Sequence, residues 1–371
     1  MSQPSALQDL VIVDFSRVLA GPLATMVLAD LGAEVVKVER PGVGDDTRHW
    51  GPPFDERGEA TYFQSVNRNK DSVAIDLGTD AGRDEARALI ARADVVVENF
   101  RPGLMASLGL DYKSLAGDKP ELVYCSVTGF GGSGAGAALP GYDLLVQAVG
   151  GLMAITGAPD GEPQKAGVAL VDVITGLFAA VGILAALRHR ERTGEGQLVE
   201  VDLLSSLLAA LVNQGSAYTL AGAVAGRMGN AHPSIAPYEL YPTGDGDLVL
   251  AVGNDKQFAA LCAVIGLEPD ARFATNKERV AHRDALRDVL VQRLAARPAA
   301  EWVPALSAAR VPAGQVNDVA GAFAFATSLG LDPVVEVPRA DGSTARLTRN
   351  PINMSATPPA YRTAPPDLPS T

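Results

Sequence analysis

One carboxylate in this sequence stands out because of the apolar residues on both sides of it. Asp172 follows the apolar run 166–171, which has the pattern of a strand, and precedes a second apolar run, 173–187. A charge in such surroundings is costly to desolvate unless a neighbouring group favours it. If a helix begins here, Asp172 could be its N-cap, because Asp is a preferred N-cap residue and suits the positive end of a helix. It could also be a nucleophile that the same helix end keeps ionised and ready to attack.

The other residue types that build common catalytic sites are sparse. The 371 residues include two cysteines, Cys125 and Cys262, and four histidines, which do not pair at the spacings of metal ligands. We therefore expect no metal site and no disulfide framework. Two unpaired cysteines fit a reducing compartment, so we expect a cytoplasmic protein.

The overall composition is that of an ordinary soluble globular protein, with 47% hydrophobic and 20% charged residues. The formal net charge is −12, which argues against a nucleic-acid partner and against an anionic membrane surface. Anionic ligands must therefore be held by local Arg or Lys side chains and by backbone amides. The longest apolar run, 173–187, is shorter than the roughly 20 residues that span a bilayer, so we expect a buried helix and no membrane partner.

Strand and helix patterns alternate over residues 1–125. Helices are predicted at 22–31, which starts with a proline and is followed by a glycine, and at 81–92. This alternation favours an α/β fold with a parallel, doubly wound sheet. The runs predicted to be strands are 10–15, 34–39, 94–98 and 122–127.

The rest of the chain is organised differently. Two long apolar helices are predicted at 173–192 and 203–222, with a strand at 197–202 between them. A smaller α+β unit follows, with one clear strand at 248–252. We therefore divide the chain into a large domain (1–200), a connecting helix (201–224), a small α+β domain (225–330) and a C-terminal segment (331–371) that is Pro-rich near its end.

The first strand, helix and second strand, followed by Glu39, resemble the start of a dinucleotide-binding fold, in which the acidic residue contacts a ribose hydroxyl. The turn after the first strand would then need the pattern Gly-x-Gly-x-x-Gly. This turn, 16–22, instead has one glycine followed by Pro22, which removes an amide that would hold the pyrophosphate. We keep the sheet and exclude NAD. Arg40, next to Glu39, could contact an adenine face or a phosphate, although a solvated charge at a strand end has the same pattern.

Segments along nearly the whole chain, taken together and in order, resemble the class III CoA-transferases of the CaiB/BaiF type. This family includes formyl-CoA and carnitine CoA-transferases and, as a branch, the α-methylacyl-CoA racemases. We expect the C-terminal helix that is usual in the family to be missing here. The segments that carry the resemblance are 14–22, 28–41, 44–48, 67–70, 99–103, 128–131, 141–143, 166–177, 193–197, 229–238 and 311–314.

What the resemblance implies for the fold is an interlocked homodimer, in which two chains thread through each other like links. Each chain would have a Rossmann-like large lobe, completed by its own C-terminal segment, and a small lobe at about 225–330. The active site would lie between the large lobe of one chain and the small lobe of the other. The acceptor acid would then bind near 230–238 and the turn 253–255 of the small lobe.

The resemblance also implies the residues of the site. By position, Asp172 matches the catalytic aspartate, and Arg40 matches the arginine that stacks on or holds the CoA adenosine. Leu19, where the formyl-CoA branch has a glutamine, and Ala20 match the CoA contact in the first turn. Many members have an arginine where Ser107 stands. The loop expected to line the CoA consists of Asn99, Phe100 and Arg101.

These residues would move CoA between an acyl-CoA and a small carboxylic acid, with CoA as a substrate and with no tightly bound cofactor. Asp172 would attack the donor thioester to form a mixed anhydride, and the CoA thiolate would then attack the aspartyl carbonyl to give an aspartyl-CoA thioester. The acceptor acid would form a second anhydride and reclaim the CoA. Backbone amides at the helix start or in the Gly-rich loop 129–141 could stabilise the oxyanions.

Two other functions remain open. A racemase needs a second base beside the carboxylate, and the racemase branch has a histidine where this chain has Tyr142. An unperturbed tyrosine titrates at about pH 10, so it is a poor base at neutral pH. We expect Tyr142 to pack against the CoA pantetheine or to donate a hydrogen bond to it, or else to be a buried aromatic beside a loop. Asp143 could assist the chemistry, although its neighbours in the sequence give no independent support for this. The third function is CoA binding without catalysis, which an N-cap at Asp172 would also fit.

Overall fold

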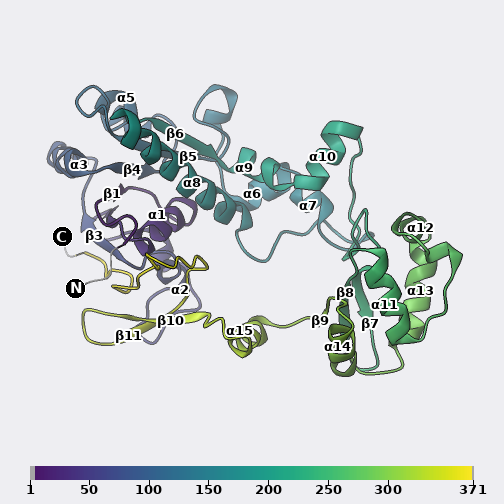
Figure 1. Cartoon of the computed structure of the whole chain (residues 1–371). Coiled ribbons are helices and arrows are strands. Elements are labelled where there is room, and N and C mark those ends of the chain that lie inside the picture. Colours follow the sequence, from purple (N-terminus) through teal and green to yellow (C-terminus); the bar gives the residue numbers. More distant parts are fainter. Residues whose placement is uncertain (1–4, 370–371) are drawn as a thin grey trace. The chain divides into compact units, whose positions relative to one another are not determined.

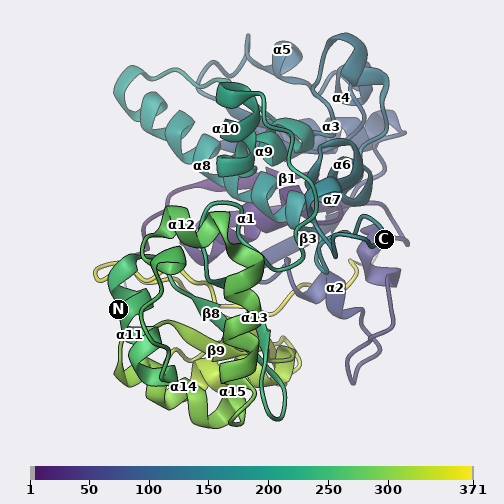
Figure 2. The ribbon, with the colours of Figure 1, turned by 90° about the vertical axis from the view of Figure 1, so that its right-hand side faces the viewer.

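The computed structural model describes residues 5–369 of the chain. It divides into two compact units, which we describe separately (Figures 1 and 2). The first unit comprises the chain up to Leu152, the segment Lys165–Ala223 and the chain from Asp332 on, and the second comprises Met153–Gln164 and Val224–Leu331. Residues 153–164 therefore group with the second unit, whereas we expected an unbroken large domain over 1–200.

A six-stranded parallel sheet forms the centre of the first unit, as the alternating pattern predicted. The strand order is β3-β2-β1-β4-β5-β6, so the order reverses between β1 and β4. In such doubly wound sheets, ligands bind at the carboxyl ends of the strands beside this reversal. Strand β3 was not predicted, because Lys70 and Asp71 interrupt its apolar pattern. The strands are β1 (Val11–Asp14), β2 (Glu34–Glu39), β3 (Lys70–Ala74), β4 (Val95–Glu98), β5 (Val123–Thr128) and β6 (Leu198–Asp202).

Helices cover both faces of this sheet (Figure 1). Ile12 and Val13 of β1 are both fully buried, and they point to opposite faces because side chains alternate along a strand. Ile12 packs in one cluster with Leu28 of α1 and Ile183 of α8, and Val13 packs in another with Ile90 of α3. These two cores confirm the predicted α/β class. The helices are α1 (Ala20–Asp30), α3 (Asp80–Arg92), α4 (Leu104–Ser107), α5 (Tyr112–Leu115) and α8 (Leu170–Thr193).

Helix α8 carries Asp172 and runs for 24 residues. It lies so close to α1 that a Cβ at Gly176 would be 2.6 Å from the carbonyl oxygen of Ala20. By length and composition, α8 is the one helix of residues 5–369 that could cross a membrane, and it is longer than the apolar run 173–187. Its inner face packs on the sheet through residues such as Ala179 and Ile183, which is typical of a core helix.

The connecting helix expected at 201–224 is in fact two helices. They meet at Val212, whose φ of 41° lies in the left-handed region that β-branched residues rarely adopt. The two helices are α9 (Leu203–Ala210) and α10 (Val212–Ala221). Shorter helices in the connections of this part of the chain are η1 (Asp46–His49), α2 (Thr61–Gln64), η2 (Gly134–Ala138), α6 (Asp143–Val149) and α7 (Leu152–Ile155).

The second unit has an antiparallel sheet of three strands, β7 (Tyr238–Pro242), β8 (Asp247–Ala251) and β9 (Ala313–Gln315), in that order. Tyr241, Leu250 and Trp302 lie in its own hydrophobic core. The unit is therefore a separate α+β body, in which only β8 had a clear strand pattern. Its helices are α11 (Asp255–Ile265), η3 (Ala271–Phe273), α12 (Asn276–Ala281), α13 (Arg283–Leu294), α14 (Ala299–Ala308) and α15 (Val319–Ser328).

The C-terminal segment returns to the first unit. It forms the hairpin of β10 (Val334–Pro338) and β11 (Thr344–Thr348) and then continues as extended chain. Asp30, at the end of α1, anchors it: its carboxylate accepts hydrogen bonds from Arg68 and from Asn350, the latter at 2.9 Å. Asn69 also accepts a bond from the amide of Arg362, at 2.7 Å. We call this group of contacts around Asp30 the C-terminal clasp.

Candidate active site

Seven of the eight predicted site residues line one cavity of about 540 Å³ in the first unit. This Asp172 cavity lies where β1, β4 and β5 end, because its walls include the residues that follow each of these strands. Asp172 is on one wall and Arg17, which was not predicted, is also in the lining. The predicted residues in this cavity are Leu19, Ala20, Asn99, Phe100, Arg101, Tyr142 and Asp172.

The eighth residue, Arg40, lines a neighbouring cavity of about 560 Å³. Ile75, Leu77 and Leu108 give this Arg40 cavity a largely apolar wall. Arg17 and Phe100 line both cavities, and the Arg17 guanidinium lies 5.2 Å from the centre of the Phe100 ring. The two cavities are therefore adjacent and share one pair of side chains as a boundary.

Asp172 lies in the first turn of α8, which begins at Leu170 after the N-cap residue Ala169. The strand predicted at 166–171 is absent, and the prediction that Asp172 is an N-cap is wrong, because no side chain caps this helix from position 169. Asp143, which belongs to α6, caps the start of α8 instead. One of its carboxylate oxygens accepts hydrogen bonds from the amides of Val171, at 2.8 Å, and Asp172, at 3.2 Å.

The electrostatic environment of Asp172 is the opposite of the one expected from a helix end. Burial, and after it the nearby negative charge of Asp143, raise the pKa of Asp172 to about 7. We expected the α8 N-terminus to keep this carboxylate ionised, but the first amides of α8 bind Asp143 instead. Near neutral pH the Asp172 carboxyl is therefore divided between its acid and its carboxylate, and the carboxylate is unusually basic.

The turn between β1 and α1 is held by side chains from two other segments. Asn99 accepts a bond from the Arg17 amide at 2.8 Å and donates one to the Arg17 carbonyl at 2.7 Å. Asp45 accepts from the amide of Val18, which has a φ of 69°, at 3.3 Å. Asn99 thus fixes the path of the turn in addition to lining the cavity. Leu19 is buried and begins α1 without a side-chain cap, so backbone amides at the start of α1 face a ligand more readily than its side chain does.

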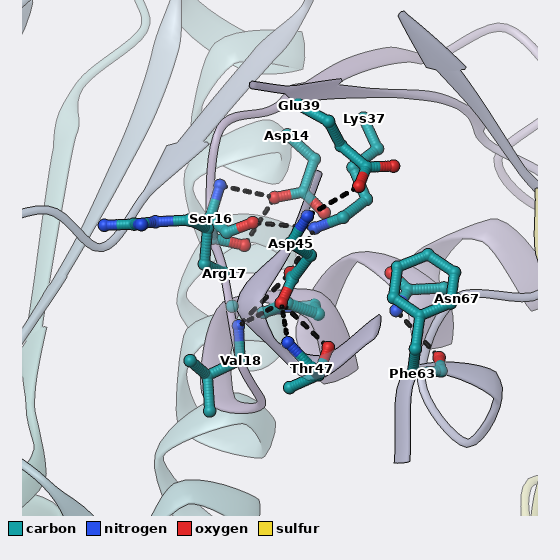
Figure 3. A network of polar contacts seen from close by, with 12 residues as sticks. Asp14, Ser16, Arg17, Val18, Lys37, Glu39, Asp45, Thr47, Phe63 and Asn67 are labelled. Carbon is teal, nitrogen blue, oxygen red and sulfur yellow. Dashed lines mark hydrogen bonds and ion pairs between the residues drawn. The ribbon is translucent and has the colours of Figure 1, made fainter. Parts of the chain in front are cut away.

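A buried network of charges supports this turn (Figure 3). The Lys37 ammonium lies 2.9 Å from an Asp45 oxygen and donates to the carbonyl of Ser16 at 2.8 Å. Lys70 reaches Asp14 at 3.1 Å, and all four charged side chains are fully buried. Burial lowers the pKa of Lys70 to about 8, whereas for Lys37 the attraction of Asp45 and Asp14 outweighs burial and raises the pKa. The sequence signal for this network was the lysine in the middle of an apolar strand, which we did not use.

Asp46 links the two arginines at the boundary between the cavities. Its carboxylate lies 3.1 Å from Arg17 and 2.6 Å from Arg40. The Arg40 side chain is half exposed, so it is accessible to a ligand in the Arg40 cavity even while it pairs with Asp46. Neither Arg17 nor Asp46 could be found from spacing, because their contact joins residues that are 29 positions apart.

Tyr142 is 65% exposed, so the expectation of a buried aromatic beside a loop is wrong. It lies at the rim of the Asp172 cavity, just before α6. Its position depends on a backbone crossing of Gly129 and Gly141, where a Cβ on either glycine would lie within 2.6 Å of the Cα of the other. The segments 230–238 and 253–255, where we expected the acceptor acid, belong to the second unit and line neither of these two cavities.

Comparisons with known proteins agree with the geometry. The sequence profile of CoA-transferase family III matches residues 7–370. The chain is 44% identical to a succinate–glutarate CoA-transferase of Agrobacterium fabrum, over 98% of this chain and 92% of the relative. It is 42% identical to an acetyl-CoA:oxalate CoA-transferase of Acetobacter aceti, over 84% of this chain and 81% of the relative.

A solved structure extends this similarity to the fold. The crystal structure of a CaiB/BaiF family protein from Brucella suis matches with a TM-score of 0.87 at 43% identity, over 99% of this chain and 97% of that one. The match includes both units and the C-terminal segment, since almost all of the chain is covered. The chain therefore belongs to CoA-transferase family III and is an enzyme that transfers CoA.

Proposed function

We propose that this enzyme moves CoA from an acyl-CoA to a small carboxylic acid by covalent catalysis at Asp172. The observation that carries the proposal is that Asp172, partly buried and basic, shares one cavity with Tyr142 and with five residues that the family resemblance assigns to CoA binding. A carboxylate with a raised pKa is a better nucleophile than an ordinary one, because its lone pair is more basic.

The proposed CoA transfer proceeds in four steps. A carboxylate oxygen of Asp172 attacks the thioester carbonyl carbon, the carbon–sulfur bond breaks, and CoA leaves as a thiolate from a mixed anhydride. The thiolate then attacks the aspartyl carbonyl and releases the donor acid as a carboxylate. The acceptor carboxylate attacks the aspartyl thioester and forms a second anhydride, again with release of thiolate. Attack of the thiolate on the acceptor carbonyl yields the new acyl-CoA and restores Asp172.

The two adjacent cavities support a placement of CoA along this site. The apolar wall of the Arg40 cavity suits an adenine ring, and Arg40 and Arg17 are cations within reach of phosphates. The pantetheine arm would then pass Phe100 and Tyr142 toward Asp172. The uncapped start of α1, at Leu19 and Ala20, offers backbone amides to an anionic group.

For the acids, we propose small dicarboxylates as acceptors. The support is the names of two similar enzymes, a succinate–glutarate CoA-transferase and an acetyl-CoA:oxalate CoA-transferase. The Asp172 cavity contains Arg17 and Arg101, which can meet a second carboxylate in a chain with a net charge of −12. Racemisation is the less favoured candidate, because Tyr142 is exposed and Asp143 is committed to the amides of α8.

An isotope experiment tests the proposed mechanism. If the acceptor acid carries a heavy oxygen isotope in its carboxylate, the second anhydride has that isotope as its bridging oxygen, and the last step leaves the isotope on Asp172. After a single turnover and digestion, we expect the peptide that contains Asp172 to be heavier by one isotopic substitution. Product formation without label in this peptide would overturn the anhydride mechanism. Deuterium exchange at the α-carbon without acyl exchange would indicate a racemase. If neither exchange occurs, CoA binding is the only function that remains.

We also propose the interlocked homodimer, supported by apolar surface on α8. Leu177, Phe178, Val181 and Leu184 recur on one side of this helix, and between 36% and 63% of each is exposed. Such a stripe on a helix surface is typical of a face that another chain covers. Sedimentation analysis should give a dimer at micromolar concentration, and a monomer would contradict the proposal. A cytoplasmic location is a further proposal, for which the support is two free cysteines, Cys125 and Cys262.

A further inference from the structure

The start of helix α8 is capped by a residue 28 positions earlier in the chain. An Asp143 oxygen accepts bonds from the amides of Val171 and Asp172, at 2.8 and 3.2 Å. The first four amides of a helix have no partner within it, and together they form its positive end. The carboxylate of Asp143 therefore occupies the place that a carboxylate of the helix itself would otherwise take.

Asp143 is itself locked in position. Its second oxygen accepts a bond from the side-chain amide of Gln147, at 2.6 Å, and Gln147 is fully buried. The oxygen of the same Gln147 amide accepts from the backbone amide of Ala166, at 2.8 Å. Gln147 thus ties α6 to the chain that leads into α8, and both oxygens of Asp143 are committed. A surface cap would not need this second support.

The side-chain oxygens of Asp172, unlike those of Asp143, have no hydrogen-bond partner among the described residues. The backbone amide of Asp172, in contrast, is bound by Asp143. Donors to a carboxylate stabilise its charged form and lower its pKa, so a partly buried carboxylate without donors, next to a second negative charge, becomes more basic. This agrees with the pKa of about 7, which is raised first by burial and then by Asp143.

The other charged and titratable groups around Asp172 do not cause the rise in its pKa. Tyr62 of α2 responds to the site, since its pKa is raised by burial and then by Asp172 and Asp143. Tyr142, before α6, lies at the rim. The remaining groups in the cavity wall are Arg17 and Asp46, which pair with each other, and Arg101.

We propose that Asp143 is the positioning residue of the catalytic site: by taking the N-terminal amides of α8, it leaves the Asp172 carboxyl unbonded in the cavity beside a fixed negative charge. This inference rests on the proposed role of Asp172 as the nucleophile. The device raises the reactivity of the attacking oxygen without any direct contact between Asp143 and the substrate. It also explains why a carboxylate at the start of a helix, which helix electrostatics alone would make a weak base, is suited to attack a thioester.

Asp143→Asn separates the charge of this residue from its hydrogen bonds. The amide oxygen of the new side chain can still accept from Val171 and Asp172, but the negative charge is gone. Its NH2 group would face the Gln147 amide nitrogen, so Asp143→Asn combined with Gln147→Glu restores an acceptor both for that group and for the amide of Ala166. The matched control is Asp318→Asn, because Asp318 caps α15 in the second unit through the amide of Gly321, at 2.7 Å.

The readout is the pH profile of kcat/KM for an acyl-CoA, together with kcat, KM and the melting temperature. For Asp143→Asn we expect the acidic limb to move to lower pH by about one unit, because the ionised form of Asp172 is no longer opposed by a like charge. We expect kcat on the plateau to fall about threefold, since the carboxylate is less basic, and KM to stay within about twofold. The double variant should recover the melting temperature and keep part of the shift, and the control should move neither limb.

An acidic limb that stays in place in both Asp143 variants, with only the melting temperature changed, would overturn the inference and leave Asp143 as a plain helix cap. The isotope label on the Asp172 peptide is measured in the same variants. Label present with an unmoved limb would refute only the role of Asp143. Product without label, in the wild-type enzyme, would refute the nucleophile itself.

Discussion

Asp172→Asn should reduce CoA transfer by about 10⁴-fold or more, while CoA binding is retained. The amide has nearly the same shape as the carboxyl but cannot attack a thioester, so the covalent route is closed. The other residues of the cavity, including Asn99 and Arg101, keep their contacts, and KM or the dissociation constant for CoA should change little. Steady-state exchange between a labelled donor acid and an acyl-CoA measures the loss. Turnover within tenfold of the wild-type rate would remove Asp172 from the mechanism.

The thermal stability of the same variant serves as a control for folding, because we expect Asp172→Asn to be more stable than the wild type above neutral pH. The pKa of Asp172 is about 7 in the folded chain and has an ordinary value of 3.8, so the folded state binds the proton more tightly than the unfolded state. The stability that this tighter binding contributes is present below pH 3.8 and is lost as the pH rises to about 7. Asn does not titrate. We therefore expect Asp172→Asn to melt higher than the wild type at pH 8 and to approach it near pH 5, and the reverse order would contradict the raised pKa.

Lys37→Met should lower the free energy of unfolding by about 3–5 kcal/mol. Met is similar in length and apolar, so the change removes the charge of Lys37 and its bond to Ser16 with little loss of volume. Asp45 would then be left buried with its charge uncompensated, and Asp14 would keep only Lys70 as a cation. Urea unfolding at neutral pH measures the loss.

The matched control for this prediction is an exposed ion pair. Arg188 and Glu191 lie 2.9 Å apart on the outside of α8 with most of both side chains exposed, so Arg188→Met should cost less than about 0.5 kcal/mol. If Lys37→Met alone does not fold, Lys37→Met combined with Asp45→Asn removes both charges and should recover part of the loss. A loss of less than about 1 kcal/mol in Lys37→Met would show that the buried pair does not stabilise this turn.

The sheet could be predicted from the sequence wherever its strands are mostly apolar. This holds for β1, β2, β4 and β5, whose residues are buried on both faces. It fails for β3, because the buried Lys70 is satisfied by partners that include Asp14 and Pro22, 56 and 48 positions away in the sequence. It also fails for the break at Val212, because the positive φ of this β-branched residue goes against its local preference.

In the site, too, features that depend on neighbouring residues in the sequence could be predicted, and features that depend on contacts between distant residues could not. The residues taken from the family resemblance, such as Asn99 and Phe100, lie in the Asp172 cavity because they belong to turns that follow strands. The electrostatics of Asp172 could not be predicted, since they depend on Asp143 approaching α8 from another helix. The contact of Arg17 with Asp46 was missed for the same reason.

The C-terminal clasp has a consequence for how subunits could exchange. Asp30 holds the returning chain through Arg68 and Asn350, so the segment 224–331 is an insertion whose two ends both connect to the first unit. The polypeptide thereby forms a ring that is closed by non-covalent bonds. If two such rings are linked, no subunit can leave until one ring opens at Asp30, and mixing of differently tagged dimers will be as slow as that local unfolding.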